Sequence, residues 1–461
     1  MYNLTVKDIV EQCGGKLIFG NEYTECINYS KDTRQINKDD VYIGIKGENF
    51  DGNQFYEQAL EAGAKVCVLQ GVEIDEAVKS KYQDRAIVVV EDTISALQKM
   101  AKYKRSKYNI PVVAVTGSVG KTSTRDMVAS VVSQKYKTLK TEGNLNNHIG
   151  LPLTILRLQD HEAMVVEMGM SNLGEIHVLS TIAKPTIAVI TNVGTAHIGN
   201  LGSRQNILLA KLEILDGLSE EGTLVINNDN DLLHDWYEHN NTYKVATFGI
   251  ENESDMQAKN IEISSNGIEF DLVTEDGTNK INVPVVSNPF VYNSMAAASV
   301  GKLLDIDIEK IKQGISNFEL TKNRMEVVKA GDITIINDCY NANFDSMKAG
   351  IESLASMKGN KKIAILGDML ELGEYSKELH YNIGIEVAKN NVDFLITVGT
   401  EAKNIAKAAI ENNMSESNVK VFDTNQEAIE CINTLKQNGD VILVKASNGM
   451  KFIEIVNALS F

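Results

Sequence analysis

The segment at residues 116–123, TGSVGKTS, constrains the fold of this chain more than any other. It follows an apolar run that predicts a buried strand, residues 112–117, and it precedes a helical pattern. Glycines at such a junction let backbone N–H groups approach phosphate oxygens, and the helix N-terminus attracts their negative charge. The spacing fits the pattern GxxGK[ST], in which Lys121 would contact the β- and γ-phosphates and Thr122 would bind Mg²⁺. The predicted phosphate loop consists of Gly117, Ser118, Val119, Gly120, Lys121, Thr122 and Ser123.

This match is to the shorter form of the motif. Val115 occupies the position where the eight-residue form has glycine. The alternative is a glycine turn followed by an accidental Lys-Thr pair. A strand before the segment and a helix after it favour the phosphate loop.

Strand and helix patterns alternate along most of the chain, which predicts an α/β fold with parallel sheets and helices on both faces. An exception lies at residues 260–286, where Asn266-Gly267 and Asp276-Gly277 separate alternating segments and predict a small antiparallel meander. A length of 461 residues suggests about three domains. We predict three α/β domains in a row: residues 1–108, a central phosphate-loop domain at 109–317, and a Rossmann-like domain at 318–461.

The charge balance excludes one class of partner. The chain carries 62 acidic and 45 basic side chains, a formal net charge of −17 at pH 7, so it would repel the phosphate backbone of DNA or RNA. No apolar run reaches the roughly 20 residues that a membrane span needs. Asp8 and Glu11 interrupt the N-terminal apolar residues, which is not typical of a signal peptide. The five cysteines are scattered without a CxxC pair, which indicates reduced thiols. We expect a soluble, monomeric, cytoplasmic protein.

Two polar residues near predicted strand ends indicate a metal site. Glu167 ends the predicted strand at residues 163–167, and His197 lies beyond the end of the strand at 186–191. Because the carboxyl ends of parallel strands meet at one crevice, both side chains should lie beside the phosphate loop. A carboxylate and a histidine there would suit Mg²⁺ or Mn²⁺. Taken singly, a surface glutamate and a loop histidine remain the alternatives.

With the phosphate loop, several other segments form one pattern. They are SKDTR (30–34), IKGENFDGNQF (45–55), TEGNLNNHIGLP (141–152), EMGMSNLGEI (167–176), TNVGTAHIGNLGS (191–203), AKLEI (210–214), NDCYNANFDSM (337–347) and LGDMLELGEYSKELH (366–380). By these segments the chain resembles the Mur ligase family, the ATP-dependent amide-bond ligases of peptidoglycan precursor synthesis. The last two segments are similar to those of members that add D-alanyl-D-alanine to UDP-N-acetylmuramoyl-tripeptide.

The resemblance implies a two-step reaction. The terminal carboxylate of the UDP-sugar-peptide attacks the γ-phosphate of ATP, which gives an acyl phosphate and ADP. The amine of the dipeptide then attacks the acyl carbon, and phosphate leaves. Such phosphoryl transfer needs charge neutralisation more than proton removal, which suits a lysine and a metal ion. Cell-wall biogenesis, and through it cell shape and cell division, would depend on the product.

The resemblance also implies roles for particular residues. The implied catalytic residues are Lys121, Glu167, His197, Lys211 and Arg324, and the implied metal ligands are Thr122, Glu167, His197 and Lys211. Lys211 aligns with a lysine that relatives carbamylate with CO₂; without the resemblance it would be taken for a solvated helix lysine. The nucleotide would also contact Asn293, Arg324 and Asp338. The implied substrate-binding residues are Ser30, Thr33, Arg34, Asn144, Asn147, Tyr340, Asn341 and Asn343.

The chain departs from the usual family pattern at several positions. Pro289-Phe290 replaces a His-Asn pair, Phe344 replaces a proline, and Asn448 replaces an arginine. These departures leave open a paralogous ligase with another acceptor or amine. A phosphate-loop nucleotide switch is the other alternative, although it gives no role to the segments at 337–347 and 366–380. The third residue of the acceptor peptide and the identity of the dipeptide stay open.

Overall fold

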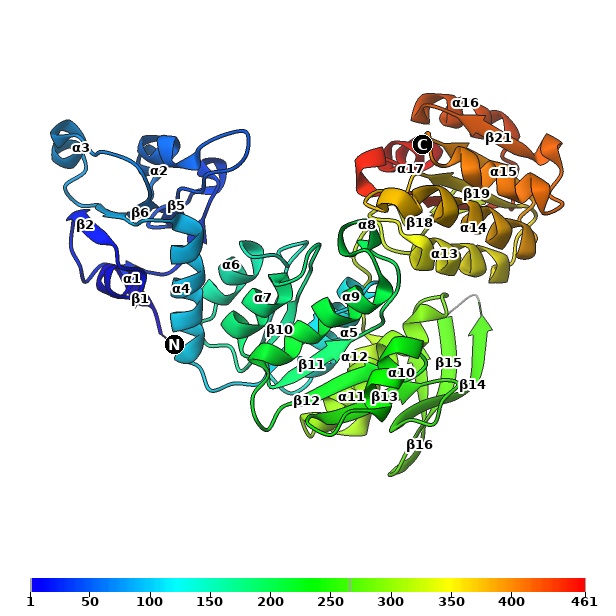
Figure 1. Ribbon diagram of the computed structural model, residues 1–461, viewed down its shortest axis with the longest axis horizontal. Coiled ribbons are helices and arrows are strands. Elements are labelled where there is room, and N and C mark those ends of the chain that lie inside the picture. Colours follow the sequence, from blue (N-terminus) through cyan, green and yellow to red (C-terminus); the bar gives the residue numbers. More distant parts are fainter. Residues whose placement is uncertain (1, 265–266, 461) are drawn as a thin grey trace.

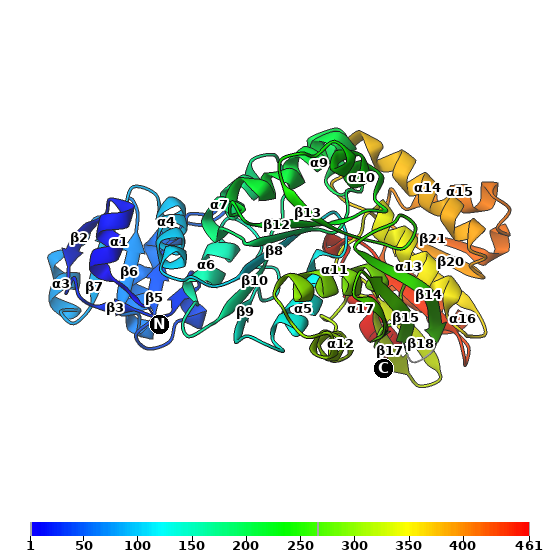
Figure 2. The same ribbon diagram turned by 90° about the horizontal axis from the view of Figure 1, so that it is seen from below.

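The computed structural model describes residues 2–264 and 267–460. Within them, strands form a five-stranded, a nine-stranded and a six-stranded sheet and one two-stranded pair. The three larger sheets follow one another along the chain and along the long axis of the molecule, from the blue N-terminal part through the green central part to the orange C-terminal part (Figures 1 and 2). The α/β class is confirmed, and none of the described helices is long and apolar enough to cross a membrane.

The N-terminal sheet has the order β2-β7-β6-β5-β4, with β2 antiparallel to β7 and the other pairs parallel. Its strands are β2 (Lys16–Phe19), β4 (Tyr29–Ser30), β5 (Val41–Ile43), β6 (Val66–Leu69) and β7 (Ala86–Val89); β1 (Leu4–Thr5) pairs with β3 (Glu25–Cys26). The helices are α1 (Val6–Cys13), α2 (Tyr56–Ala62), α3 (Glu76–Lys81) and α4 (Thr93–Ser106), with 3₁₀ turns η1 (Thr33–Gln35) and η2 (Gly52–Phe55). Helix α1 begins at a capping box, in which Thr5 and Asp8 each bond the other's backbone N–H.

Helix α4 joins the N-terminal part to the central part. Near its C-terminal end the buried Lys104 donates to the carbonyl of Leu156 at 2.7 Å, and the buried Arg105 donates to the carbonyl of Ala183 at 2.8 Å. These carbonyls lie at the ends of α6 (Gly150–Leu156) and α7 (Glu175–Ala183), where cations complement the helix dipole. Burial lowers the pKa of Lys104 to about 8. The cationic end of the helix is therefore a clamp on the central part and not a solvated linker.

We expect the replacement Arg105→Met to destabilise this clamp. The guanidinium also donates to the carbonyls of Tyr108 at 2.6 Å and Lys184 at 3.3 Å, so its loss leaves three acceptors without their donor. The free energy of unfolding should fall by about 3 kcal/mol, as measured by urea unfolding. Lys102→Met on the exposed side of the same helix is the control and should change it by less than about 0.5 kcal/mol. Equal values for the two variants would contradict the clamp.

The central sheet has the order β9-β10-β8-β11-β12-β13-β14-β15-β16 and is parallel from β9 to β14. Its strands are β8 (Val112–Thr116), β9 (Thr138–Lys140), β10 (Ala163–Glu167), β11 (Ile187–Ile190), β12 (Thr223–Asn227), β13 (Lys244–Gly249), β14 (Met256–Ser264), β15 (Gly267–Thr274) and β16 (Gly277–Val283). The predicted meander, β14 to β16, is antiparallel and extends this sheet. Of its predicted turns, Asn266 lies outside the described residues.

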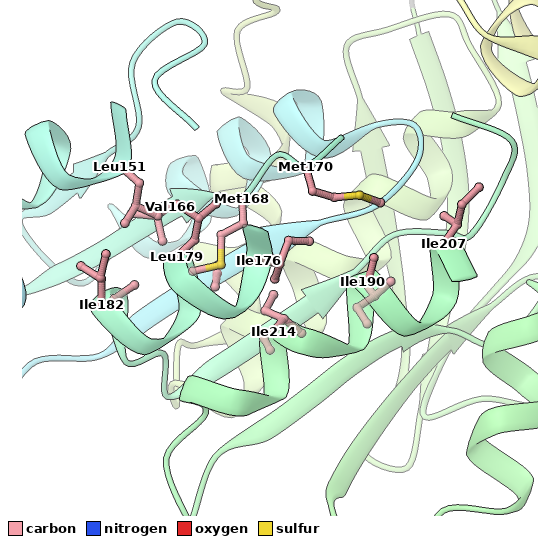
Figure 3. Packing of buried hydrophobic residues seen from close by; sticks show 14 of the residues in the cluster. Leu151, Val166, Met168, Met170, Ile176, Leu179, Ile182, Ile190, Ile207 and Ile214 are labelled. Atoms are coloured by element: carbon pink, nitrogen blue, oxygen red, sulfur yellow. The ribbon is translucent and has the colours of Figure 1, made fainter. Parts of the chain in front are cut away.

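Helices cover both faces of the central sheet, as predicted. On one face, side chains such as Val166, Met168 and Ile190 pack against Ile176 and Ile207, from α7 and α9 (Figure 3). The opposite face packs on α5, α11 and α12. Besides α6 and α7, the helices are α5 (Lys121–Val132), α8 (Ile198–Leu201), α9 (Arg204–Leu212), η3 (Glu213–Gly217), α10 (Asp231–Glu238), α11 (Pro289–Leu303) and α12 (Ile308–Ser316).

The C-terminal sheet has the order β17-β18-β22-β19-β20-β21, and β17 is its antiparallel edge strand. The strands are β17 (Glu326–Ala330), β18 (Ile333–Asn337), β19 (Lys362–Gly367), β20 (Phe394–Val398), β21 (Val419–Phe422) and β22 (Val441–Lys445). The helices are α13 (Phe344–Ser356), η4 (Gly373–Tyr375), α14 (Ser376–Lys389), α15 (Lys403–Glu411), η5 (Glu416–Asn418), α16 (Asn425–Leu435), η6 (Asn448–Met450) and α17 (Ile453–Ser460). This doubly covered, mostly parallel sheet agrees with the Rossmann-like prediction.

Candidate active site

A cavity of about 470 Å³ lies between the central part and the C-terminal part. The register of the central sheet explains where this cavity lies. Glu167 pairs with Val115 and Ile190 with Thr116, so the C-terminal ends of strands β10, β8 and β11 lie side by side next to the phosphate loop. Most of the predicted site residues line it: Ser118, Val119, Gly120, Lys121, Thr122, Ser123, Asn144, Asn147, Glu167, His197, Asn293, Arg324, Asp338, Tyr340, Asn341 and Asn343. The predicted Ser30, Thr33, Arg34, Gly117 and Lys211 are not part of this lining.

The phosphate loop has the backbone that the glycines allow. Gly117 and Gly120 have φ values of +152° and +81°, and a Cβ atom at Gly117 would lie 1.9 Å from Oγ1 of Thr191. Asn192 holds the loop, since its side-chain oxygen accepts from the N–H of Val119 at 2.9 Å. A side chain at Gly117 would therefore clash as well as strain the loop.

Lys121 is folded back onto this loop. Its Nζ donates to the carbonyl of Gly117 at 2.7 Å, and burial together with the cation of Arg324 lowers its pKa, while Glu167 acts in the opposite direction. A partly buried ammonium with only carbonyl partners is undersupplied with negative charge. Phosphate oxygens would supply it, so this loop fits a nucleotide.

Glu167 is buried and already partnered. Oε2 accepts from Nη1 of Arg125 at 3.2 Å, and Oε1 accepts from Nδ2 of Asn146 at 2.7 Å. Asp126 in turn holds the guanidinium of Arg125 with two oxygens at 2.8 Å and also accepts from Thr321, which lies in the linker to the C-terminal part. The carboxylate is thus held in one orientation while keeping lone pairs that a cation could use.

His197 lies where the C-terminal part meets the central part. Its backbone has φ of +63°, and its Nδ1 lies 2.7 Å from Oε2 of Glu371. Burial lowers the pKa of His197, the Lys121 cation adds to this, and the Glu371 carboxylate opposes it. A neutral imidazole keeps one nitrogen lone pair, as a metal ligand must.

Lys211 lies at the C-terminal end of α9 and is almost fully buried, with 1% of its surface exposed. Burial lowers its pKa well below the ordinary value, and the neighbouring cation of Lys121 lowers it further. A lower pKa favours the neutral amine, which is the form that reacts with CO₂. Among residues 2–264 and 267–460 no group of three His, Cys, Asp or Glu could hold a metal ion. A carbamate here would add a second carboxylate-like group to that of Glu167.

Arg324 and Asp338 bring charge from the C-terminal part. The guanidinium of Arg324 stacks on the ring of Tyr340, 4.0 Å from its centroid, and its Nε is buried with no hydrogen bond to any described residue. Asp338 pairs with the buried Lys445 at 2.5 Å. Asn293 accepts a hydrogen bond from the hydroxyl of Thr124 at 3.0 Å. The side chains that line the cavity and could contact a ligand are those of Arg324, Asp338, Lys445 and Asn293. The Nε–H of Arg324 is still free to donate a hydrogen bond.

Several predicted substrate residues also have local structural roles. Asn147 accepts from the N–H groups of Ile149 and Gly150, where α6 begins, and Asn343 caps α13. In the N-terminal part, Arg34 pairs with Asp32 and keeps 87% of its side chain exposed. The bonds of Asn147 and Asn343 fix backbone at the cavity wall, and none of these contacts by itself defines a ligand.

The polar residues that sequence reasoning missed at the site include Arg125, Asn146, Glu371 and Lys445. Lys445 ends a buried parallel strand, so the rule that found Glu167 would have found it. Asn146 and Glu371 lie within quoted segments, but no local signal distinguishes them from neighbouring polar residues. Arg125 follows Lys121 by one helical turn, where a solvated cation is equally expected.

Comparisons with known proteins agree along almost the whole chain. Three family models match, described as "Mur ligase family, catalytic domain" (residues 28–105), "Mur ligase middle domain" (115–301) and "Mur ligase, glutamate ligase domain" (323–448). Curated relatives carry the name UDP-N-acetylmuramoyl-tripeptide–D-alanyl-D-alanine ligase. The one from Bacillus subtilis (strain 168) is 38% identical over 100% of this chain and 99% of its own length, and that from Escherichia coli (strain K12) is 31% identical over the same shares.

Solved structures give the same result. A crystal structure of MurF from Acinetobacter baumannii superposes with a TM-score of 0.90 at 30% identity, covering 100% of this chain and 99% of that one. MurF from Thermotoga maritima in complex with ADP gives a TM-score of 0.82 at 26% identity, covering 94% and 97%. With the phosphate loop, the three sheets and these matches together, the chain belongs to the Mur ligase family.

Proposed function

We propose that this protein is an ATP-dependent ligase that joins D-alanyl-D-alanine to the terminal carboxylate of UDP-N-acetylmuramoyl-tripeptide, in the cytoplasm, during peptidoglycan precursor synthesis. The observation that carries the proposal is the cavity of about 470 Å³, which the phosphate loop and residues of the segment Asn337–Met347 line together. The names of the curated relatives and the family membership support it.

In the first step a carboxylate oxygen of the acceptor forms a bond to the γ-phosphorus of ATP, and the bond from that phosphorus to the bridging oxygen of ADP breaks. Lys121 and Arg324 supply positive charge beside the transferring group. Asn293 and Asp338 would hold the nucleoside, while Asn144 and Asn147 would hold the acceptor near the loop. The uridine diphosphate end would bind at Ser30, Thr33 and Arg34 in the N-terminal part.

In the second step the dipeptide amine attacks the acyl carbon of the acyl phosphate, the C–O bond to phosphate breaks, and the leaving phosphate takes up the proton that the amine loses. Tyr340, Asn341 and Asn343 would place the dipeptide at the wall that the C-terminal part contributes. A bound Mg²⁺ or Mn²⁺ would neutralise phosphate charge, and Thr122, Glu167, His197 and a carbamylated Lys211 have the donor types to hold it. The monomer contains every residue of this scheme.

A paralogous ligase with a different amine is the second candidate. A side cavity of about 250 Å³ adjoins the main one and is lined by Tyr340, Leu370 and Asn448, among others. Asn448 stands where the family usually has arginine, so this cavity has lost a cation that could pair with a carboxylate. An amine substrate without the usual terminal carboxylate would suit such a wall.

Phosphate release from ATP and Mg²⁺, with each substrate present or omitted, tests the proposal. We expect release only when both UDP-muramoyl-tripeptide and D-alanyl-D-alanine are present, with a product heavier by one dipeptide less water. Release that needs neither substrate would favour a nucleotide switch instead. A folded protein that binds ATP but forms no product with both substrates would favour the paralogue.

A further inference from the structure

We propose that Glu371, which belongs to the C-terminal part, is a positioning residue for His197 of the central part. It would fix the tautomer and the orientation of the imidazole, so that docking of the C-terminal part completes the phosphate site. The inference deepens the proposed function and rests on it for the role of His197. The contact between the two residues stands independently of that role.

The contact joins two side chains 174 positions apart. Oε2 of Glu371 lies 2.7 Å from Nδ1 of His197, whose side chain keeps 19% of its surface exposed. The two atoms are close enough for a hydrogen bond, but Nδ1 of His197 makes none to the described residues in this conformation. A small rotation of the imidazole ring would form it. Both residues have φ of +63°, a conformation that non-glycine residues adopt only where their surroundings hold them.

Close packing between the two parts maintains this contact. A Cβ atom at Gly199, in α8, would lie 2.6 Å from the backbone nitrogen of Gly373. The hydroxyl of Tyr375 donates to the carbonyl of Gly202 at 2.7 Å, and Leu372 is buried next to Glu371. The turn that carries Glu371 therefore fits α8 with no room for a side chain between them.

The turn is also held from within the C-terminal part. His380 is fully buried; its Nε2 accepts from the N–H of Met369 at 2.9 Å, and its Nδ1 lies 2.7 Å from the carbonyl of Ser376. The N–H of Leu370 donates to the hydroxyl of Ser447 at 2.9 Å. Because both residues before Glu371 are fixed through their backbones, the turn that carries Glu371 is already held when the two parts dock, while its side chain keeps 57% of its surface exposed.

The chemical consequence concerns the two nitrogens of His197. A carboxylate that accepts the proton of Nδ1 keeps it on that nitrogen, so Nε2 retains its lone pair. Carboxylates bonded to metal-ligating histidines commonly act in this way, and their loss lowers metal affinity or activity about 10- to 100-fold. Lys121 and Lys211 act on the same imidazole electrostatically, so a wrongly oriented ring would disturb charge at the phosphate site.

Three variants test the inference. Glu371→Ala removes the acceptor, Glu371→Gln keeps a neutral oxygen acceptor, and Glu374→Ala is the control. Glu374 lies in the same turn, is exposed, and makes no hydrogen bond or ion pair within the described residues. We expect Glu371→Ala to lower kcat by about 10- to 100-fold with a much smaller change in KM for the dipeptide. Glu371→Gln should restore most of the loss, and Glu374→Ala should resemble the wild type.

A measurement on the protein without nucleotide or metal distinguishes a loss of His197 positioning from a general loss of structure. In protein labelled with ¹⁵N-histidine, the ring signals of His197, assigned with His197→Gln, should report a proton on Nδ1 in the wild type and in Glu371→Gln. Glu371→Ala should shift these signals toward the mixed tautomers of a free imidazole.

Unchanged His197 signals in Glu371→Ala, or a Glu371→Gln variant no more active than Glu371→Ala, would overturn the inference. A wild type that forms no product with the dipeptide would refute the proposed function instead, and the signals of His197 would still decide the contact.

Discussion

Replacing Lys121 by methionine should lower kcat by about 10²- to 10³-fold, which is the usual effect of removing one charged donor from a transferring group. Lys121 is the partly buried cation of the phosphate loop, and among the described residues its Nζ has only backbone carbonyls as hydrogen-bond partners. Methionine has nearly the same length, so packing around the loop should persist. The phosphate-release assay with both substrates measures the effect.

Lys184→Met is the matched control for this variant. Lys184 also lies in the central part, but its side chain is exposed and contacts no described residue through a hydrogen bond or ion pair. Its kcat should equal that of the wild type. A tenfold loss of kcat corresponds to about 1.4 kcal/mol of transition-state stabilisation. If Lys121→Met kept kcat within about threefold of the wild type, Lys121 would stabilise the transition state by less than this, and its phosphate-binding role would be wrong.

The second large effect is expected at Lys211. Lys211→Met should lower kcat by about 10²-fold if a carbamate on this amine is a metal ligand. The variant should be no less stable than the wild type, because methionine removes a buried ionisable group that burial already disfavours. Low activity in a stable protein would thus point to chemistry and not to misfolding.

Carbon dioxide gives an independent check on Lys211. Wild-type protein equilibrated with ¹³CO₂ should show a carbamate carbon signal that Lys211→Met lacks, and removal of dissolved CO₂ should lower wild-type activity. A wild-type activity that does not respond to CO₂, together with an active Lys211→Met, would contradict carbamylation. Lys211→Arg, which keeps a permanent cation at this position, should be at least as inactive as Lys211→Met.

The phosphate-loop part of the fold could be predicted because its signals are local. The strand at residues 163–167 is a continuous apolar run that ends in a charge, and the structure has β10 with the same bounds. Shorter or edge strands were missed: β9 has three residues, and β17 alternates as an exposed edge. Helix α11 begins at Pro289, since proline favours the first turn of a helix.

From the sequence, site residues could be predicted only where they lie at or follow the C-terminal end of a predicted parallel strand. Glu167 ends a strand, and parallel register brings it to the phosphate loop. The partnership between His197 and Glu371 depends on how the C-terminal part sits on α8, which no local pattern encodes. The domain boundaries and the roles of individual residues stay predictions, since the comparisons establish the family and not the function of each side chain.

The clamp of α4 on α6 and α7 has a consequence for which acceptors can react. Lys104 and Arg105 fasten the N-terminal part to the central part, so the distance from Arg34 to the phosphate loop is set by the protein. In the proposed function the uridine end binds near Arg34, so this fixed distance would favour acceptor peptides of one length. We expect a precursor one residue shorter or longer to be a poorer substrate, whatever its side chains.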